Sequence, residues 1–172
     1  MATSGPTTTT VPNELILDTT GLGVADYQAP ADEVVATLTG LLGEPTEDTG
    51  WVDPITIGTC LSNEARRVSW NSLSVFFGDN GEPGSRQFFT YSYGDVADLG
   101  AEPIGLLTPA GIGIGSTIAD LRAAYPEVTI NLGEEGLIES TFFVDENLGG
   151  LVTGDADTDV VTVIYGSWPF CG

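Results

Sequence analysis

Apolar residues recur at helical spacing in two segments of the chain. In residues 30–43, Val34, Leu38 and Leu41 stand at positions i, i+4 and i+7, which places them on one face of a helix. Residues 117–125 show the same kind of spacing, and a proline that would stop a helix follows at once. The pattern therefore predicts two amphipathic helices, one in each of these segments.

Other segments are rich in the aromatic and β-branched residues that strands favour. In residues 88–94, Phe89, Tyr91 and Tyr93 alternate with threonine and serine, so they share one face of a strand. Gly- and Asp-bearing turns at 78–85 and 154–159 join neighbouring strands. The strands are expected at residues 14–18, 74–79, 88–94, 140–145 and 160–166.

Three short segments of the first half recur in the second half in the same order. "GLGV" matches "GIGI", "SVFFGD" matches "STFFVD", and "FFTYSYG" matches "VVTVIYG". The spacing between the matches differs because the first half holds extra residues near 46–70. Ordered internal matches indicate a tandem duplication.

These elements predict an α+β protein made of two tandem β-α-β-β(-β) repeats. The repeats would form one mainly antiparallel sheet, with one helix packed per repeat. We expect residues 1–12 to be a Thr/Pro-rich disordered tether. The first repeat would cover residues 13–100, including the insertion near 46–70, and the second repeat residues 101–172.

A resemblance to known proteins rests on Gly23, Val35, Leu42, Gly43, Pro45, Gly113, Gly115, Ser116 and Leu121. With these residues the helix of the first half resembles a unit of small bacterial outer-membrane assembly lipoproteins, which the β-lactamase inhibitory protein family uses twice in tandem. The chain departs from this pattern in that the second helix ends in "AAYPEV". It is also similar to exported proteins of high-GC Gram-positive bacteria. The resemblance implies an exported, non-enzymatic protein whose sheet or loops bind another protein.

The charge of the chain is strongly negative, with 25 acidic residues against 4 arginines and a net charge of −21. Such a surface repels nucleic acid and anionic lipid. Two explanations remain: an acidic surface suited to high salt, or a surface that binds a basic partner or cations. No apolar run is long enough to span a membrane.

The absence of histidine and lysine from the sequence excludes Ser-His-Asp, Cys-His and Ser-Lys catalysis and histidine-based zinc sites. Paired carboxylates are the remaining catalytic option. Glu134–Glu135 and Asp145–Glu146 lie at expected turns, which favours exposure to solvent rather than a catalytic cleft. We therefore expect that the protein is not an enzyme and has no cofactor.

A binding surface is predicted from arginine and aromatic residues, the types that dominate protein interfaces. Arginines in so acidic a chain have an alternative role, which is to form intramolecular ion pairs. The residues assigned to this surface are Trp51, Arg66, Arg67, Trp70, Tyr91 and Tyr93.

Two further motifs each have a functional and a structural interpretation. Asp155, Asp157 and Asp159 have the spacing of the first ligands of a calcium loop, yet an acidic hairpin tip would have the same sequence. The glycine-rich turn 111–117 stands where phosphate-binding loops occur, but it lacks both the dinucleotide fingerprint and the Walker lysine. Because "GLGV" occupies the same place in the first half, we interpret this turn as fold geometry.

Cys60 and Cys171 are the two cysteines of the chain and lack the spacing of a metal site. A disulfide between them is expected, with two buried thiols as the alternative. Together with the tether, the disulfide favours a secreted or surface-tethered protein. We expect a monomeric, non-enzymatic protein-binding module, for example of an inhibitor-like kind, with no membrane contact beyond a lipid anchor. The alternative is a calcium- or salt-dependent structural protein of the cell surface.

Overall fold

The computed structural model describes residues 14–60, 63–79, 81–94 and 103–167. The described residues form two α-helices, one short 3-10 helix and eight strands, which confirms the α+β class. The helices are α1 (Ala31–Leu42), η1 (Pro54–Ile57) and α2 (Ile118–Ala124). The strands are β1 (Glu47–Asp48), β2 (Ala65–Trp70), β3 (Leu73–Gly78), β4 (Gln87–Gly94), β5 (Thr129–Asn131), β6 (Ser140–Asp145), β7 (Leu148–Val152) and β8 (Val161–Tyr165).

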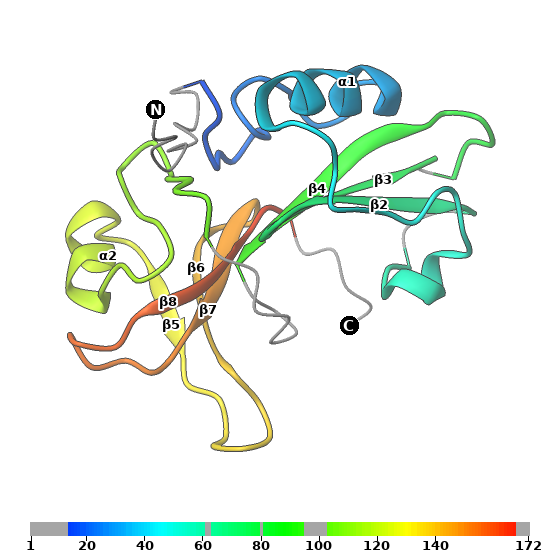
Figure 1. Ribbon diagram of the computed structural model, residues 1–172. Helices are drawn as coiled ribbons and strands as arrows, with labels where there is room; N and C mark the ends of the chain where they lie inside the picture. The colour runs from blue at the N-terminus through cyan, green and yellow to red at the C-terminus, as the bar shows by residue number, and fades with distance from the viewer. Residues whose placement is uncertain (1–13, 61–62, 80, 95–102, 168–172) are drawn as a thin grey trace, which may run out of the picture.

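The eight strands form one antiparallel sheet in the order β1-β2-β3-β4-β8-β7-β6-β5 (Figure 1). Each half of the chain contributes four neighbouring strands, preceded in sequence by one helix. The halves join at the centre, where β4 pairs with β8 through the register Ser92↔Tyr165. The sheet therefore consists of two blocks of four strands, joined edge to edge through β4 and β8.

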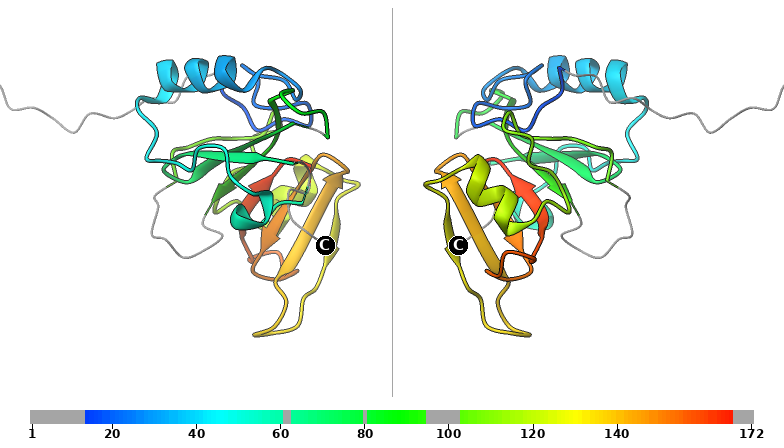
Figure 2. Two further views of the ribbon diagram at one scale, coloured as in Figure 1. Left: turned by 90° about the vertical axis from the view of Figure 1, so that its right-hand side faces the viewer. Right: turned by 90° about the vertical axis from the view of Figure 1, so that its left-hand side faces the viewer.

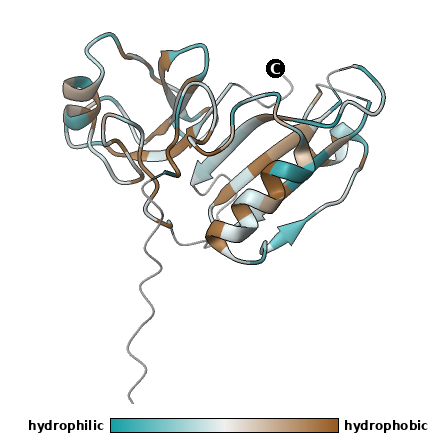
Figure 3. Cartoon of the chain, turned by 90° about the horizontal axis from the view of Figure 1, so that it is seen from above, coloured by the Kyte–Doolittle hydropathy of each residue, from teal (hydrophilic) through white to brown (hydrophobic). Residues whose placement is uncertain are grey.

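Both helices pack into one hydrophobic core against the sheet. Leu38 of α1 and Leu121 of α2 are fully buried in the same cluster as Phe77, Phe142 and Ile164 of the strands. Figure 3 shows α1 and α2 at opposite ends of the molecule, each beside the strands of its own half. Burial of one apolar face of each helix explains why the helical spacing of the sequence is informative.

The segment before α1 is hydrogen-bonded to the start of β4. Gln28 N donates to Phe88 O (2.7 Å), Phe88 N donates to Ala29 O (2.9 Å), and Ala31 N donates to Arg86 O (3.0 Å). Gln28 has a φ of 73°, in the left-handed region. These bonds fix where α1 begins relative to the sheet.

The segment before α2 is attached to β8 by the same three bonds. Gly115 N donates to Val161 O (2.8 Å), Val161 N to Ser116 O (2.9 Å), and Ile118 N to Asp159 O (2.8 Å). Gly115 has a φ of 86° and precedes its helix by as many residues as Gln28 does. The two halves therefore place their helices by an equivalent arrangement.

The strand pairs next to the centre also share an irregularity. The β3–β4 register shifts between Phe76 and Phe77, and the β7–β8 register shifts between Leu151 and Val152. β3 and β7 occupy corresponding positions on either side of the β4–β8 pair. The bulge thus lies at the same place in each half of the sheet.

Several expectations from the sequence need correction. The "SVFFGD" and "STFFVD" segments lie in β3 and β6, which do not occupy corresponding positions in the sheet order. The supposed insertion near 46–70 contains β1 and β2, which belong to the sheet. Residues 14–18 do not form a strand. The tether at 1–12 lies outside the described residues.

Candidate functional site

The turn between β5 and β6 extends away from the rest of the sheet (Figure 2). We call residues 132–139 the hairpin tip. Three of its side chains are large, apolar and mostly exposed: Leu132 (63%), Leu137 (81%) and Ile138 (64%). Exposed apolar side chains gathered on one loop are typical of an interaction site, whereas scattered ones need no explanation.

Backbone hydrogen bonds hold the hairpin tip in one shape. The amides of Leu137 and Ile138 both donate to Glu134 O, at 2.8 and 2.9 Å. Gly133 N donates to Ser140 Oγ (3.1 Å), and any side chain at Gly133 would collide with the carbonyl of Ile138. The tip therefore presents its apolar side chains from a preformed loop, which lowers the entropy cost of binding.

Carboxylates surround the apolar residues of the hairpin tip. Glu134, Glu135 and Glu139 are exposed. The four arginines of the chain form ion pairs with other carboxylates. The tip is therefore an apolar patch bordered by uncompensated negative charge.

The sequence-based binding set did not include the hairpin tip. The sequence does hold a signal: two leucines and an isoleucine lie in the Gly- and Glu-rich stretch "NLGEEGLIES", which has neither helical nor strand periodicity to bury them. Glu134 and Glu135 were assigned correctly to an exposed turn.

The predicted arginines form intramolecular ion pairs, the alternative role considered above. Arg66 donates to both carboxylate oxygens of Asp48 (Nε 2.9 Å, Nη2 2.6 Å), and Arg67 donates to Glu47 (2.7 Å). The Arg66 guanidinium holds the pKa of Asp48 below its ordinary value, mainly through the hydrogen bond between the two side chains. These pairs join β1 to β2.

The predicted tryptophans are also occupied within the chain. The guanidinium of Arg86 lies 4.3 Å from the ring centroid of Trp51, a cation–π contact. Trp70 is only 2% exposed, and its indole Nε1 donates to Gly43 O at 2.9 Å. Trp70 is therefore a core residue that anchors the end of α1, and its assignment to a binding surface is wrong.

Tyr91 and Tyr93 share one face of β4, as predicted, but that face is the one covered by the core. They are 0% and 1% exposed. Tyr91 Oη donates to Asp18 O (3.0 Å), and Tyr93 Oη accepts from the amides of Gly105 and Leu106. Both side chains fasten loops to the sheet, which removes them from the predicted binding surface.

The three aspartates of the 154–159 turn do not converge. Asp157 pairs with Arg122 (3.0 Å), while Asp159 accepts from Thr153 Oγ1 and Ala156 N, both at 2.9 Å. Among the described residues, no group of three acidic or cysteine side chains is placed to hold a metal ion. Asp155 belongs to the same turn, and calcium binding by these three aspartates stays a prediction.

The glycine-rich turn 111–117 uses its backbone amides within the fold. Gly115 N donates to Val161 O and Ile118 N to Asp159 O, at and just before β8. Ser116 N donates to Gly113 O (3.1 Å). Thr117 caps α2, as its position before the helix suggests. These amides therefore already donate to backbone carbonyls of the fold and do not point to a bound phosphate.

Cys60 is disulfide-bonded, and the described residues contain no free cysteine. Cys171 lies outside the described residues, so the pairing of Cys60 with Cys171 stays a prediction. None of the described helices combines the length and apolar character that crossing a membrane requires.

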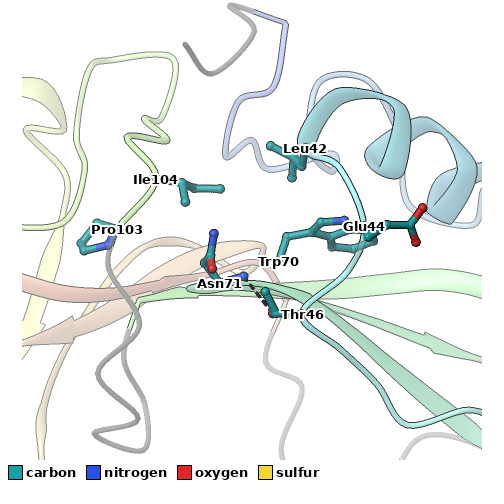
Figure 4. Close-up of a pocket in the computed structure, with 7 residues that line it drawn as sticks. All are labelled: Leu42, Glu44, Thr46, Trp70, Asn71, Pro103 and Ile104. Carbon is teal, nitrogen blue, oxygen red and sulfur yellow. Dashed lines mark hydrogen bonds between the residues drawn. The ribbon is translucent and has the colours of Figure 1, made fainter. Parts of the chain in front are cut away.

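A pocket of about 280 Å³ lies between the end of α1, the β2–β3 turn and the segment at 103–104 (Figure 4). Asn71, at the tip of the β2–β3 turn, has a φ of 53° and stands between Pro103 and Trp70. Its backbone amide donates to Thr46 Oγ1 at 3.1 Å. The described residues that line it are Leu42, Glu44, Thr46, Trp70, Asn71, Pro103 and Ile104.

Comparison with known proteins leaves the resemblance described above as a prediction. No protein-family model, no curated protein and no solved structure matches the chain. The candidate sites are therefore judged on their geometry alone.

Proposed function

We propose that this chain is a non-enzymatic protein-binding module, exported or tethered at the cell surface, which contacts its partner through the hairpin tip. The observation that carries the proposal is the exposure of Leu132, Leu137 and Ile138 on a loop whose backbone is fixed by Glu134 and Gly133. Apolar anchors presented by a rigid loop are the residues from which interface hot spots are built.

The charge of the hairpin tip favours a partner of a particular kind. Its three glutamates and the net charge of −21 would attract a partner with basic residues around an apolar depression. Such complementarity accelerates association and suppresses binding to acidic proteins. The apolar side chains would supply the affinity, and the glutamates would supply the selection.

We also infer that the two halves arose by tandem duplication. The inference is supported by the equivalent hydrogen bonds before α1 and α2 and by the equivalent bulges in β3–β4 and β7–β8. Such matches in backbone geometry are more informative than the "SVFFGD" match, which joins strands that do not correspond. In related chains, an alignment of the first half with the second half should then match β3 with β7. Alignments that match β3 with β6 would contradict this correspondence.

Replacing the apolar residues of the hairpin tip tests the proposed function. The Leu137→Ser/Ile138→Ser double variant removes two exposed side chains and should leave the fold intact. Ile55→Ser is the matched control, because Ile55 is 78% exposed but lies in η1. Immobilised protein is incubated with envelope and culture extracts, and each retained protein is purified and titrated.

We expect a retained protein that binds the unmodified chain saturably at micromolar concentration or tighter. The control should bind it equally well, and the double variant should bind at least about tenfold more weakly, since two exposed anchors contribute about 1 kcal/mol or more each. The proposal fails if no saturable partner is retained, or if the double variant and the control bind alike.

A further inference from the structure

The pocket beside Asn71 has a composition that selects for one class of small ligand. Its lining is mixed: Leu42, Ile104, Pro103 and Trp70 form the apolar part, and Glu44, Thr46 and Asn71 form the polar part. Figure 4 shows Leu42 next to the end of α1 and Ile104 across from it on the 103–104 segment, with Asn71 below both. A volume of about 280 Å³ is just below the usual range for ligand sites, so one ring or short chain would fill it.

Asn71 provides a polar group for a ligand in this pocket. Its side chain is exposed, and within the described residues the side-chain amide has no hydrogen-bond partner, because the contact with Thr46 uses the backbone. An amide both donates and accepts, so it can bind a hydroxyl or amide of a ligand. The backbone of Asn71 is left-handed and is held by the hydrogen bond from its amide to Thr46 Oγ1.

The electrostatics of the pocket favour a positive ligand. Glu44 lies at the rim, with its carboxylate on the side away from Asn71 (Figure 4). The pocket is at the end of α1, where the helix dipole is negative, and α1 has no basic residue in its last turn, whereas α2 has Arg122. Among the described residues of the lining, Glu44 is the ionisable side chain.

We propose that this pocket binds a small organic cation, in which an ammonium group and a hydrogen-bonding group are joined by an apolar body. The ammonium would lie near Glu44, the apolar body between Leu42 and Ile104, and the hydrogen-bonding group against Asn71. The cation can be a free amine or a lysine-like side chain presented by a peptide. This site is independent of the hairpin tip, which lies on the β5–β6 turn of the other half.

A matched set of tyramine analogues tests the proposal. Tyramine carries an ammonium and a hydroxyl, tyrosol is its neutral analogue, 4-hydroxyphenylacetate its anionic analogue, and phenethylamine lacks the hydroxyl. Each is titrated into isotope-labelled protein at 0.15 M NaCl, and the NMR signals of the Trp70 indole N–H and the Asn71 side-chain amide are followed. A lysine blocked at both ends represents the peptide source.

We expect tyramine to shift both signals saturably, tyrosol and phenethylamine to bind at least about threefold more weakly, and 4-hydroxyphenylacetate not to bind. Glu44→Gln should weaken tyramine binding at least about threefold. Glu33→Gln, which removes the same charge from the exposed start of α1, should leave it unchanged. Tighter binding of tyramine than of blocked lysine assigns a free amine, and the reverse assigns a peptide side chain.

Three results would overturn the proposal. One is equal binding of tyramine and tyrosol, which would mean that charge plays no part. The second is an equal effect of Glu44→Gln and Glu33→Gln, since tyramine would then be attracted only by the net charge of the protein. The third is a set of shifts that avoids Trp70 and Asn71, since tyramine would then bind elsewhere.

Discussion

The buried carboxylate of Asp79 illustrates how one charged residue is stabilised inside the fold. It is 1% exposed and directly follows the last residue of β3. Its oxygens accept from Asn63 N (3.0 Å), Asn63 Nδ2 (3.1 Å) and Gly81 N (3.1 Å). Burial acts to raise the pKa of Asp79, but these hydrogen bonds outweigh it and hold the pKa below its ordinary value.

Asp79→Asn should therefore lower the melting temperature by several degrees at neutral pH, because the amide would set a donor against Asn63. A carboxyl group with a lowered pKa stabilises the fold fully above its ordinary pKa of 3.8 and loses this effect as the pH falls through the lower folded-state value. The difference from the unmodified chain should thus narrow below about pH 4. Thermal melts from pH 3 to 8 measure it, with exposed Asp155→Asn as the control.

A difference between the melting temperatures of the two chains that stays constant over this range would contradict the role of the Asp79 charge. A fall of the same size for Asp155→Asn would show that net charge alone is responsible.

Residue roles were predictable from the sequence only where a role follows from spacing. The alternation in β4 correctly placed Tyr91 and Tyr93 on one face, but the register shift puts Phe88, not the predicted Phe89, in the core with them. Alternation also does not say which face the helices cover. The tyrosines are in the core for that reason, while Leu137 and Ile138, which belong to no periodic pattern, are exposed. Long-range packing decided both outcomes.

At the scale of elements, the start of α2 is defined by a complete capping box. Thr117 Oγ1 accepts from Asp120 N (3.1 Å), and the Asp120 carboxylate accepts from Thr117 N (3.2 Å). The helix has only seven residues, so such a cap is a large part of its local stabilisation.

Thr117→Ala should cost about 1 kcal/mol of unfolding free energy, since it removes the acceptor for Asp120 N. Thr117→Ser keeps that acceptor and should cost less than half as much. Urea unfolding gives both values, and Thr158→Ala, an exposed threonine in the 154–159 turn, is the control. Equal losses for alanine and serine would show that the side-chain hydroxyl of Thr117 does not carry the cap.

The elements that were predicted correctly have a local signal, and the others do not. Helical spacing and terminal residues located α1 and α2 to within a residue or two. Residues 14–18 instead pack against the core as an irregular segment. Leu15 and Leu17 are buried, and Leu17 N donates to Leu107 O in another loop. Their apolar pattern therefore reports burial, which the sequence alone does not distinguish from strand pairing.

For the whole molecule, the distribution of charge matters more than any single ion pair. All four arginines are paired with carboxylates, two of them bidentately. Surface pairs contribute about 0–1 kcal/mol each. The net charge of −21 acts in the opposite direction, because the remaining carboxylates repel one another in the compact state.

Salt should therefore stabilise the protein. Raising NaCl from about 0.02 to 1 M shortens the screening length to about 3 Å, which weakens the few attractions and the many repulsions together. If screening recovers about 1–2 kcal/mol of net repulsion, the melting temperature should rise by roughly 2–8 °C. The rise should shrink near pH 4, where many carboxylates bind protons, and an unchanged or falling melting temperature would show that the arginine pairs dominate.

Millimolar CaCl₂ and MgCl₂ at one ionic strength should change the melting temperature alike, since Asp157 and Asp159 are engaged by Arg122 and Thr153. A rise in melting temperature specific to calcium would instead support the calcium-dependent structural function predicted from the 155–159 aspartates.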